Sequence, residues 1–269
     1  MTHTYSFDRT VAFYDDTRGL PAPVLDGVVA ALAMEIRAAG GGPVLEMGVG
    51  TGRIALPLAA RGIEVHGVDV ATSMLAELLR KGEEQPADAA PVWVCRADAT
   101  HLPVGDGVYG AAIASLILHL LRDWRTAVHE LLRAVRPGGV LLIDPDGRSE
   151  LNLELSTQLE RIVGRSLRAG VRDAAELDAF MAEQGLEARP LGPFSVERRT
   201  TLRTWLDRLR ANWYSHTWTL DDATRDAACD ELARCAESRY GDLDAEVADV
   251  HALRWRAFRL VGSPARGDR

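Results

Sequence analysis

The chain has 269 residues, of which 47% are hydrophobic and 26% are charged, and its formal net charge is −8. Such a balance is typical of a globular domain with one large core. The negative charge argues against a nucleic-acid partner, because binding to a duplex depends on Lys and Arg side chains that neutralise phosphates.

Signals for export or membrane insertion are missing from the sequence. The N-terminal residues MTHTYSFDRT are polar, and the longest apolar run, YGAAIASLILHLL, is too short to span a bilayer. The three cysteines cannot build a disulfide framework. We therefore expect a cytoplasmic protein with no membrane partner, whose oligomeric state stays open.

Helices and strands alternate along the first part of the chain. A helix is predicted over residues 24–36, where apolar residues recur at helical spacing. The five strands that follow are VLEMG, IEVHGVDV, PVWVCRAD, YGAAIASLIL and VLLID. The helices between them are RIALPLAARG, TSMLAELLRKG and a stripe over residues 128–135 that RPGG ends. This alternation predicts a doubly wound α/β fold, in which ligands bind beyond the carboxyl ends of the strands.

The second part of the chain is richer in helices. FSVERRT is predicted as a sixth strand and EVADVHALRWRAFRL as a closing edge strand, antiparallel in a mostly parallel seven-stranded sheet with helices on both faces. We predict one domain over residues 1–269. Its parts are an N-terminal helical cover (1–39), an α/β core (40–200), a helical lid insertion (201–240), and a closing strand with a tail (241–269).

A glycine-rich turn follows the first predicted strand. Gly48, Gly50 and Gly52 form a GxGxG pattern, whereas the dinucleotide fingerprint GxGxxG needs its third glycine where Arg53 stands. The spacing makes NAD less favoured. A plain tight turn is the alternative for the glycines alone.

Carboxylates stand at the ends of the next two strands. Asp69 ends the second strand about 20 residues after the first glycine. In nucleotide-binding sheets a carboxylate at this position binds ribose hydroxyls, whether or not the cofactor is NAD. Asp98 follows the third strand, where it can accept from an adenine amino group while the Ala99 N–H reaches a ring nitrogen. Helix capping or a solvated turn is the alternative for each Asp. Together these residues favour a nucleoside ligand.

Four segments resemble, in order, the motifs of class I S-adenosylmethionine-dependent methyltransferases of the bacterial small-molecule type. They are VLEMGVGTGRIALPLAARGIEVHGVDVATSML, CRADATHLP, IASLILHLLRDW and LLRAVRPGGVLLI, over about residues 44–143. The resemblance implies a Rossmann-like fold whose α/β core binds S-adenosylmethionine (SAM), with S-adenosylhomocysteine (SAH) as product. It implies contacts from Glu46, Gly48, Gly50 and Gly52 to the methionine half, Asp69 to the ribose, Val70, Asp98 and Ala99 to the adenine, and Ser115 to the methionine amino group. The carboxyl group of Glu46, shortly before the glycine-rich turn, also favours a positively charged ligand.

Two residues are predicted to lie beside the methyl group. FYDDTRGLP is similar to a segment of these enzymes whose Tyr folds over the cofactor, which implies this role for Tyr14; a Tyr packed on an amphipathic helix is the alternative. Transfer from a sulfonium needs in-line positioning, exclusion of water and, for a protonated acceptor, a base. His119 is the first candidate base because it follows the fourth strand and titrates near neutral pH. A structural His under LILHLL is the competing interpretation.

The segment NWYSHTW gathers aromatic side chains between predicted helices. As a lid it would supply an apolar wall with one polar group, and His216 is the second candidate base. As a satellite core it would only join the insertion to the sheet. The predicted substrate-binding residues are Tyr14, His119, Trp213, Tyr214, His216 and Trp218. No metal site is predicted.

The sequence thus predicts a SAM-dependent methyltransferase that acts on an O, N or C atom of a small-molecule acceptor. A methyltransferase acting on protein or RNA is one alternative, and a non-catalytic SAM-binding protein is another. A dinucleotide oxidoreductase is disfavoured by Arg53.

Overall fold

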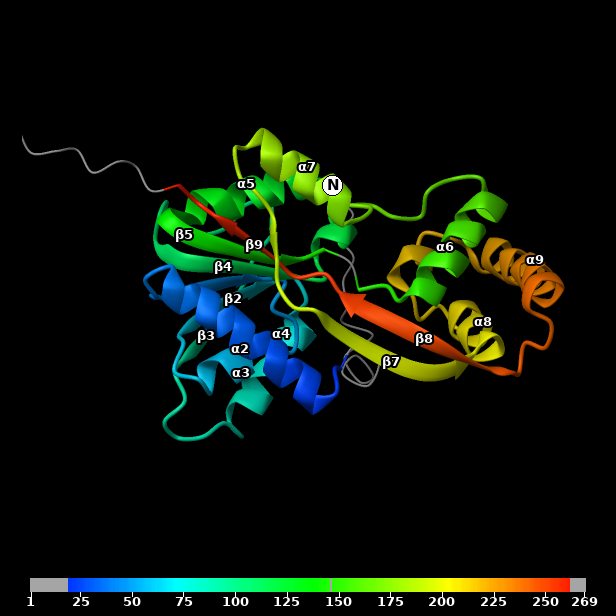
Figure 1. Cartoon of the computed structure of the whole chain (residues 1–269), viewed down its shortest axis with the longest axis horizontal. Coiled ribbons are helices and arrows are strands. Elements are labelled where there is room, and N and C mark those ends of the chain that lie inside the picture. Colours follow the sequence, from blue (N-terminus) through cyan, green and yellow to red (C-terminus); the bar gives the residue numbers. More distant parts are fainter. Residues whose placement is uncertain (1–18, 146, 262–269) are drawn as a thin grey trace, which may run out of the picture. The chain divides into compact units, whose positions relative to one another are not determined.

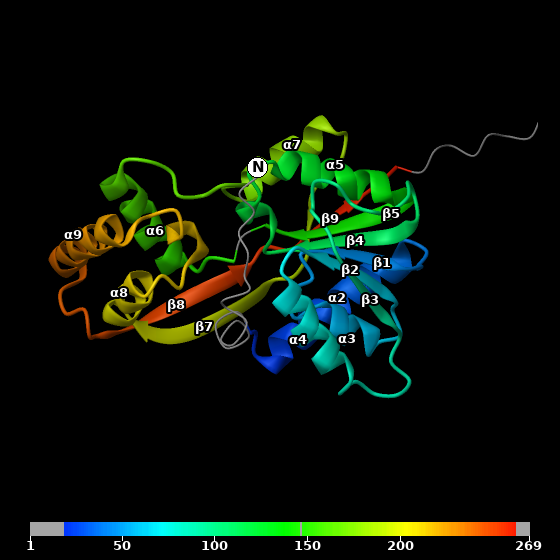
Figure 2. The same cartoon turned by 180° about the vertical axis from the view of Figure 1, so that it is seen from behind.

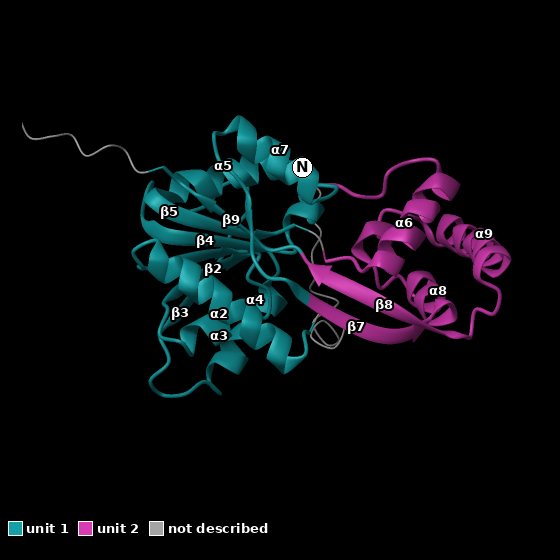
Figure 3. Cartoon of the chain, viewed as in Figure 1, with its two compact units in different colours: residues 1–146, 170–194, 254–269 teal, residues 147–169, 195–253 magenta. Residues whose placement is uncertain are grey.

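The computed structural model describes residues 19–145 and 147–261, which form two compact units. Unit 1 comprises residues 1–146, 170–194 and 254–269, and unit 2 comprises residues 147–169 and 195–253 (Figure 3). The chain therefore passes from one unit to the other four times. The division into a cover, a core, a lid insertion and a closing strand stays a prediction.

Unit 1 is built on a seven-stranded sheet with the order β3-β2-β1-β4-β5-β9-β6. Its strands are β1 (Val44–Met47), β2 (Val65–Asp69), β3 (Val92–Arg96), β4 (Tyr109–Ser115), β5 (Val135–Asp144), β6 (Arg189–Pro190) and β9 (Arg256–Arg259). The first five strands pair in parallel, and β9 is antiparallel to both β5 and β6. The predicted mostly parallel, Rossmann-like sheet with an antiparallel late strand is confirmed.

Helices cover both faces of this sheet (Figures 1 and 2). They are α2 (Ala22–Ala38), α3 (Ala55–Ala59), α4 (Thr72–Gly82), the 3₁₀ turn η1 (Leu118–Leu120), α5 (Trp124–Ala134) and α7 (Ala174–Glu183). In both views α2, α3 and α4 lie on one face and α5 and α7 on the other. All residues of β1 and β4 are consequently buried, which is why the sequences of these strands are mostly apolar.

The predicted fourth strand ends earlier than expected. YGAAIASLIL is extended only as far as Ser115, and Leu116 then takes a positive φ of 55°. The amide of Leu116 donates to the Asp144 carbonyl oxygen at 2.9 Å, which ties the ends of β4 and β5 together. This turn directs η1 across the end of the sheet.

Two strand predictions for the second part of the chain are wrong in their pairing. FSVERRT does form a strand, β7 (Phe194–Thr201), but it pairs with β8 (Glu246–Leu253) in a separate two-stranded sheet. The predicted closing strand is divided, so that β8 belongs to this small sheet and β9 to the large one. Strand character is local, whereas the partner of a strand is decided by packing that a short pattern does not encode.

Unit 2 packs three helices beside the β7–β8 sheet. They are α6 (Glu150–Val163), α8 (Leu202–Arg210) and α9 (Asp222–Tyr240), with the 3₁₀ turn η2 (Ser215–Thr217) after α8. Their apolar faces form a core of their own around Leu159, Trp205 and Leu232. Both helices predicted between residues 201 and 240 lie in this unit. Over residues 19–145 and 147–261, no helix combines the length and apolarity that a membrane crossing requires.

Candidate functional site

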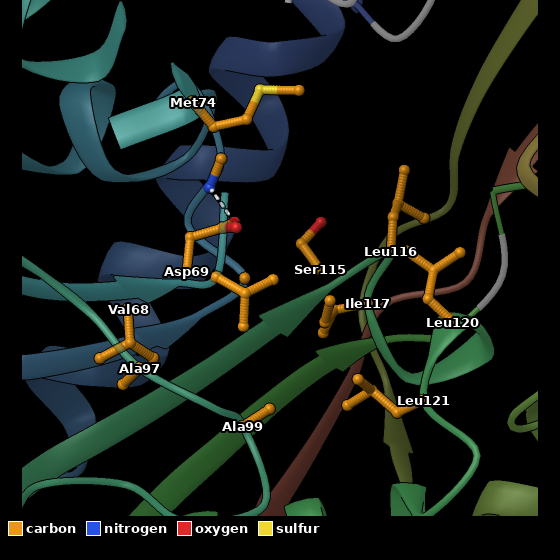
Figure 4. A pocket seen from close by; sticks show the side chains of 13 residues that line it. Val68, Asp69, Met74, Ala97, Ala99, Ser115, Leu116, Ile117, Leu120 and Leu121 are labelled. Carbon is orange, nitrogen blue, oxygen red and sulfur yellow. Dashed lines mark hydrogen bonds between the residues drawn. The ribbon is translucent and has the colours of Figure 1, made fainter. Parts of the chain in front are cut away.

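A pocket opens in unit 1 at the carboxyl ends of the parallel strands (Figure 4). Its empty volume is about 690 Å³, including its opening to solvent. The lining comes from four neighbouring strand ends and α4: Gly48, Gly50, Val68, Asp69, Val70, Met74, Ala97, Ala99, Ser115, Leu116, Ile117, Leu120 and Leu121. This is where a doubly wound sheet binds its ligands.

The three glycines of the turn after β1 serve different needs. All three have positive φ, at 68° for Gly48, 53° for Gly50 and 82° for Gly52. A Cβ atom on Gly48 would lie 2.8 Å from Ile117 Cγ1, and one on Gly52 would lie 2.9 Å from Leu56 Cγ. A Cβ on Gly50 would meet only the Gly48 carbonyl oxygen, at 4.0 Å. Gly48 and Gly52 therefore permit internal packing, while Gly50 keeps backbone open toward the pocket that it lines.

Asp69 holds this turn against the end of β2. Its Oδ2 accepts from the Gly50 amide at 3.0 Å, dashed in Figure 4, and its Oδ1 accepts from the Ala71 amide at 2.9 Å. A carboxylate has about four lone-pair sites, more than these two bonds use. Asp69 can thus fix the glycine turn and accept from a ligand hydroxyl at the same time.

Glu46 is a buried carboxyl group beneath the glycine turn. Its side chain is 2% exposed, and Oε2 has no hydrogen-bond partner among the residues that the structure describes. Burial raises the pKa of Glu46 to about 8; the positive charge of Arg53 opposes this rise and the negative charge of Asp69 adds to it. An ionised carboxylate left unpaired in such a place is costly, so the position favours either a proton or a cationic ligand group.

Arg53 connects the glycine turn to the end of β4, a role that the sequence analysis did not foresee. Its Nη2 donates to Ser115 Oγ at 2.9 Å. In the sequence, Arg53 is notable only because it stands where the dinucleotide pattern GxGxxG needs its third glycine. Its reach to a strand end 62 residues away becomes visible only once β1 and β4 are neighbours.

The residues predicted for the adenine lie around the end of β3. Ala99 and Val70 line the pocket. Asp98 Oδ1 accepts from both the amide and the hydroxyl of Thr100, at 2.9 and 2.8 Å, so part of this side chain stabilises a turn as the alternative interpretation expected. Asp98 itself is not among the pocket-lining residues, and its contact with an adenine stays a prediction.

His119 lies in η1, between residues that line the pocket. Leu120 and Leu121 contribute to the wall, whereas His119 is half-buried and does not itself line it. Its carbonyl oxygen accepts from the Gly170 amide at 3.1 Å, which fixes the backbone of the turn. Tyr14, the other residue predicted beside the methyl group, lies outside the described residues. A catalytic role for either side chain stays a prediction.

The segment NWYSHTW forms a stacked aromatic cluster within unit 2. The Tyr214 ring stacks on Trp205 with centroids 5.2 Å apart and on His216 at 5.6 Å. Trp218 Nε1 donates to the Asn212 carbonyl oxygen at 2.9 Å.

Trp213 is the outermost side chain of this segment. It is 38% exposed, with the Arg208 guanidinium 5.5 Å from its ring centroid. The satellite-core interpretation accounts for the contacts of Tyr214, His216 and Trp218, and the lid function stays a prediction. Within the described ranges, no group of three or more His, Cys, Asp or Glu side chains could hold a metal ion.

Comparison with known proteins identifies one segment of the chain. Residues 45–143 match a family model described as a methyltransferase domain. The biotin biosynthesis bifunctional protein BioHC of Cellvibrio japonicus is 31% identical over 182 residues, which are 63% of this chain and 34% of that protein. The demethylmenaquinone methyltransferase of Thermus thermophilus is 38% identical over 102 residues, 37% of this chain and 45% of the relative. The chain thus spans less than half the length of these two relatives.

A solved structure extends the likeness to the fold. Magnesium protoporphyrin IX methyltransferase from Synechocystis, with bound SAH, superposes with a TM-score of 0.52 over 71% of this chain and 90% of that one, at 19% identity. An identity this low shows the fold alone. Residues 45–143 are thus similar to a methyltransferase domain, and the sheet of unit 1 has the Rossmann-like strand order of the solved methyltransferase structure.

Proposed function

We propose that the protein is a SAM-dependent methyltransferase that transfers a methyl group to an O, N or C atom of a small-molecule acceptor. The observation that carries this proposal is the pocket at the strand ends, whose glycine turn is held open by Asp69 inside the matched methyltransferase domain. Two matched relatives are named for biotin biosynthesis and for demethylmenaquinone methylation, both of which concern small molecules. Free thiols at all three cysteines support a cytoplasmic location.

The residues present fit SAM. Asp69 lines the pocket with a carboxylate that can accept from ribose hydroxyls, and Val70 and Ala99 offer apolar faces to an adenine ring. The buried oxygen Glu46 Oε2 lacks a partner among the described residues, which suits the ammonium group of the methionine half. Asp98 would accept from the adenine amino group. SAM supplies a methyl group that is already electrophilic because its sulfur is a sulfonium.

The protein then has to position the acceptor and exclude water. Correct placement of two reactants alone is worth on the order of 7–11 kcal/mol in favourable cases. The wall formed by Ile117, Leu120 and Leu121 is apolar and excludes water from one side of the pocket. His119, with Tyr14, is proposed beside the acceptor, where an imidazole takes a proton from a hydroxyl or ammonium nucleophile.

Unit 2 is proposed to carry the acceptor-binding residues. Trp213 is the most accessible aromatic side chain of its segment, Tyr214 and His216 are stacked on each other, and Trp218 is the fourth residue proposed to contact the acceptor. An aromatic wall with one imidazole is the usual make-up of a small-molecule pocket.

The decisive experiment separates cofactor binding from acceptor class. SAH is titrated calorimetrically into the full chain, with NAD as the rival ligand. The chain is then incubated with SAM labelled in its methyl group and a cell extract, which is afterwards fractionated into small molecules, protein and RNA. Saturable SAH binding with label in the small-molecule fraction supports the proposal.

The other outcomes each contradict a stated part of it. Label in protein or RNA would contradict the acceptor class, and SAH binding without any transfer would identify a non-catalytic binder. Saturable NAD binding without SAH binding would refute the cofactor. Asp69→Asn serves as the control that should lose label in every fraction.

A further inference from the structure

Arg53 brings a positive charge to Ser115, a residue that lines the pocket. Its guanidinium is half-buried and donates through Nη2 to Ser115 Oγ at 2.9 Å. Ser115 is 8% exposed and lines the pocket at the end of β4. The hydroxyl therefore fixes the guanidinium close to the space that a ligand would fill.

This charge has no ionic partner within the described residues. No carboxylate oxygen there lies within 4.0 Å of the Arg53 guanidinium. The nearest candidates are engaged otherwise: Asp69 accepts from two backbone amides, and the pKa of about 8 leaves Glu46 mostly protonated at neutral pH. On its other side Arg53 shares a hollow with Arg80, Lys81 and Glu84, and the Glu84 carboxylate is already paired with Arg80.

A guanidinium in this situation is suited to an anionic ligand group. It has five N–H donors, of which the bond to Ser115 uses one, so a planar carboxylate can still be bound through two parallel hydrogen bonds. Beneath the same turn, Glu46 Oε2 is buried and lacks a donor. An α-amino acid has a carboxylate, which can bind to Arg53, and an ammonium group, which can bind to Glu46.

We propose that Arg53, oriented by Ser115, binds the α-carboxylate of the methionine half of the cofactor. The inference rests on the proposed function, since it assumes that SAM and SAH occupy the pocket. It makes Arg53 a specificity-determining residue, because adenosine compounds without an amino-acid carboxylate would leave the guanidinium unpaired.

The test is a cycle of two proteins and two ligands. Wild-type chain and Arg53→Gln are each titrated calorimetrically with SAH and with decarboxylated SAH, which keeps the ammonium and lacks the carboxylate. Wild type should bind SAH roughly 10- to 100-fold more tightly than the decarboxylated ligand, the usual effect of one charge-assisted pair of hydrogen bonds. For Arg53→Gln the two ligands should bind within about threefold of each other, because the selective contact is gone.

Two further variants separate this role from a structural one. Arg80→Gln removes a cation from the neighbouring hollow and should keep the wild-type preference for SAH. Ser115→Ala keeps the guanidinium but frees it, so the preference should shrink without vanishing. Thermal melts of all variants check that they are folded.

Each result bears on one claim. A wild-type chain that binds SAH and its decarboxylated form equally would overturn the inference and leave the proposed function standing, even if Arg53→Gln fails to fold. The inference would also be overturned if Arg53→Gln weakened both ligands by the same factor, which would show a structural effect only. A wild-type chain that binds neither ligand would refute the proposed function itself.

Discussion

Replacing Asp69 by Asn tests the cofactor site with a change of very small volume. Asp69 accepts from the amides of Gly50 and Ala71 through its two oxygens. An asparagine amide has one oxygen and one nitrogen, and the nitrogen cannot accept. One of the two backbone bonds is therefore lost, and the group facing the pocket is no longer charged.

The size of the effect follows from these contacts. A hydrogen bond to a charged group contributes about 1.5–3 kcal/mol. If one charged contact to the ribose is lost, SAH affinity should fall roughly 10- to 150-fold. The glycine turn loses one internal bond worth about 1 kcal/mol, so the melting temperature should fall by only about 2–4 °C for a chain of this size.

Calorimetric titration with SAH and a thermal melt measure these two quantities separately. Asp123→Asn is the matched control, because Asp123 caps α5 by accepting from the Thr126 amide at 3.4 Å, and Asn caps a helix equally well. The control should leave SAH affinity and stability unchanged. A folded Asp69→Asn variant whose SAH affinity stays within twofold of wild type would refute the assignment of Asp69.

Five other substitutions address the glycine turn, the buried carboxyl, the candidate base and the lid. Gly50→Ala should remain folded but lose SAH binding, measured by calorimetry, whereas Gly52→Ala should lower the melting temperature because its Cβ would lie 2.9 Å from a leucine side chain. Folding raises the pKa of Glu46 from 4.5 to about 8, so the folded state holds this proton more tightly than the unfolded state. The free energy of unfolding therefore declines as pH rises between those two values. Glu46→Gln should abolish that decline in thermal melts recorded across this pH range. If His119 is a base, His119→Gln should reduce kcat about 10²–10⁴-fold at neutral pH, and kcat should recover at high pH. An unchanged kcat at every pH would remove His119 from the mechanism. Trp213→Ala should raise the KM for the acceptor and leave SAH affinity unchanged; unchanged kinetics would return this side chain to a packing role.

The strands of the large sheet could be predicted because strands buried on both faces have mostly apolar sequences. β1 and β4 are buried along their whole length and appear in the sequence as mostly apolar runs, broken in β1 by Glu46 and ended in β4 by Ser115. The pairing of β7 could not be predicted in this way. Its burial is mixed, with several exposed residues, and its partner β8 lies more than forty residues further along the chain. The sequence of a half-exposed strand does not indicate which of two sheets the strand will join.

The candidate site was predictable where it depends on backbone geometry and not where it depends on long side chains. The glycines and Asp69 stand at fixed offsets from strand ends, so their meeting follows from the topology. The contact between Arg53 and Ser115 depends on a flexible side chain that crosses to the end of another strand. The same holds for Glu46, whose raised pKa comes from burial that its neighbours in sequence do not reveal.

The position of β9 has a consequence for synthesis of the chain. This strand lies between β5 and β6 in the sheet, and Phe258 within it and Trp255 directly before it are almost completely buried. More than one hundred residues separate the end of β5 at Asp144 from the start of β9 at Arg256. At a translation rate of about 5–20 residues per second, the outer edge of β5 waits roughly 5–20 s for its partner. An unpaired strand edge is a template for association with other chains. The nascent protein is therefore most vulnerable to aggregation at β5, and this vulnerability ends only when the last strand of the sheet is made.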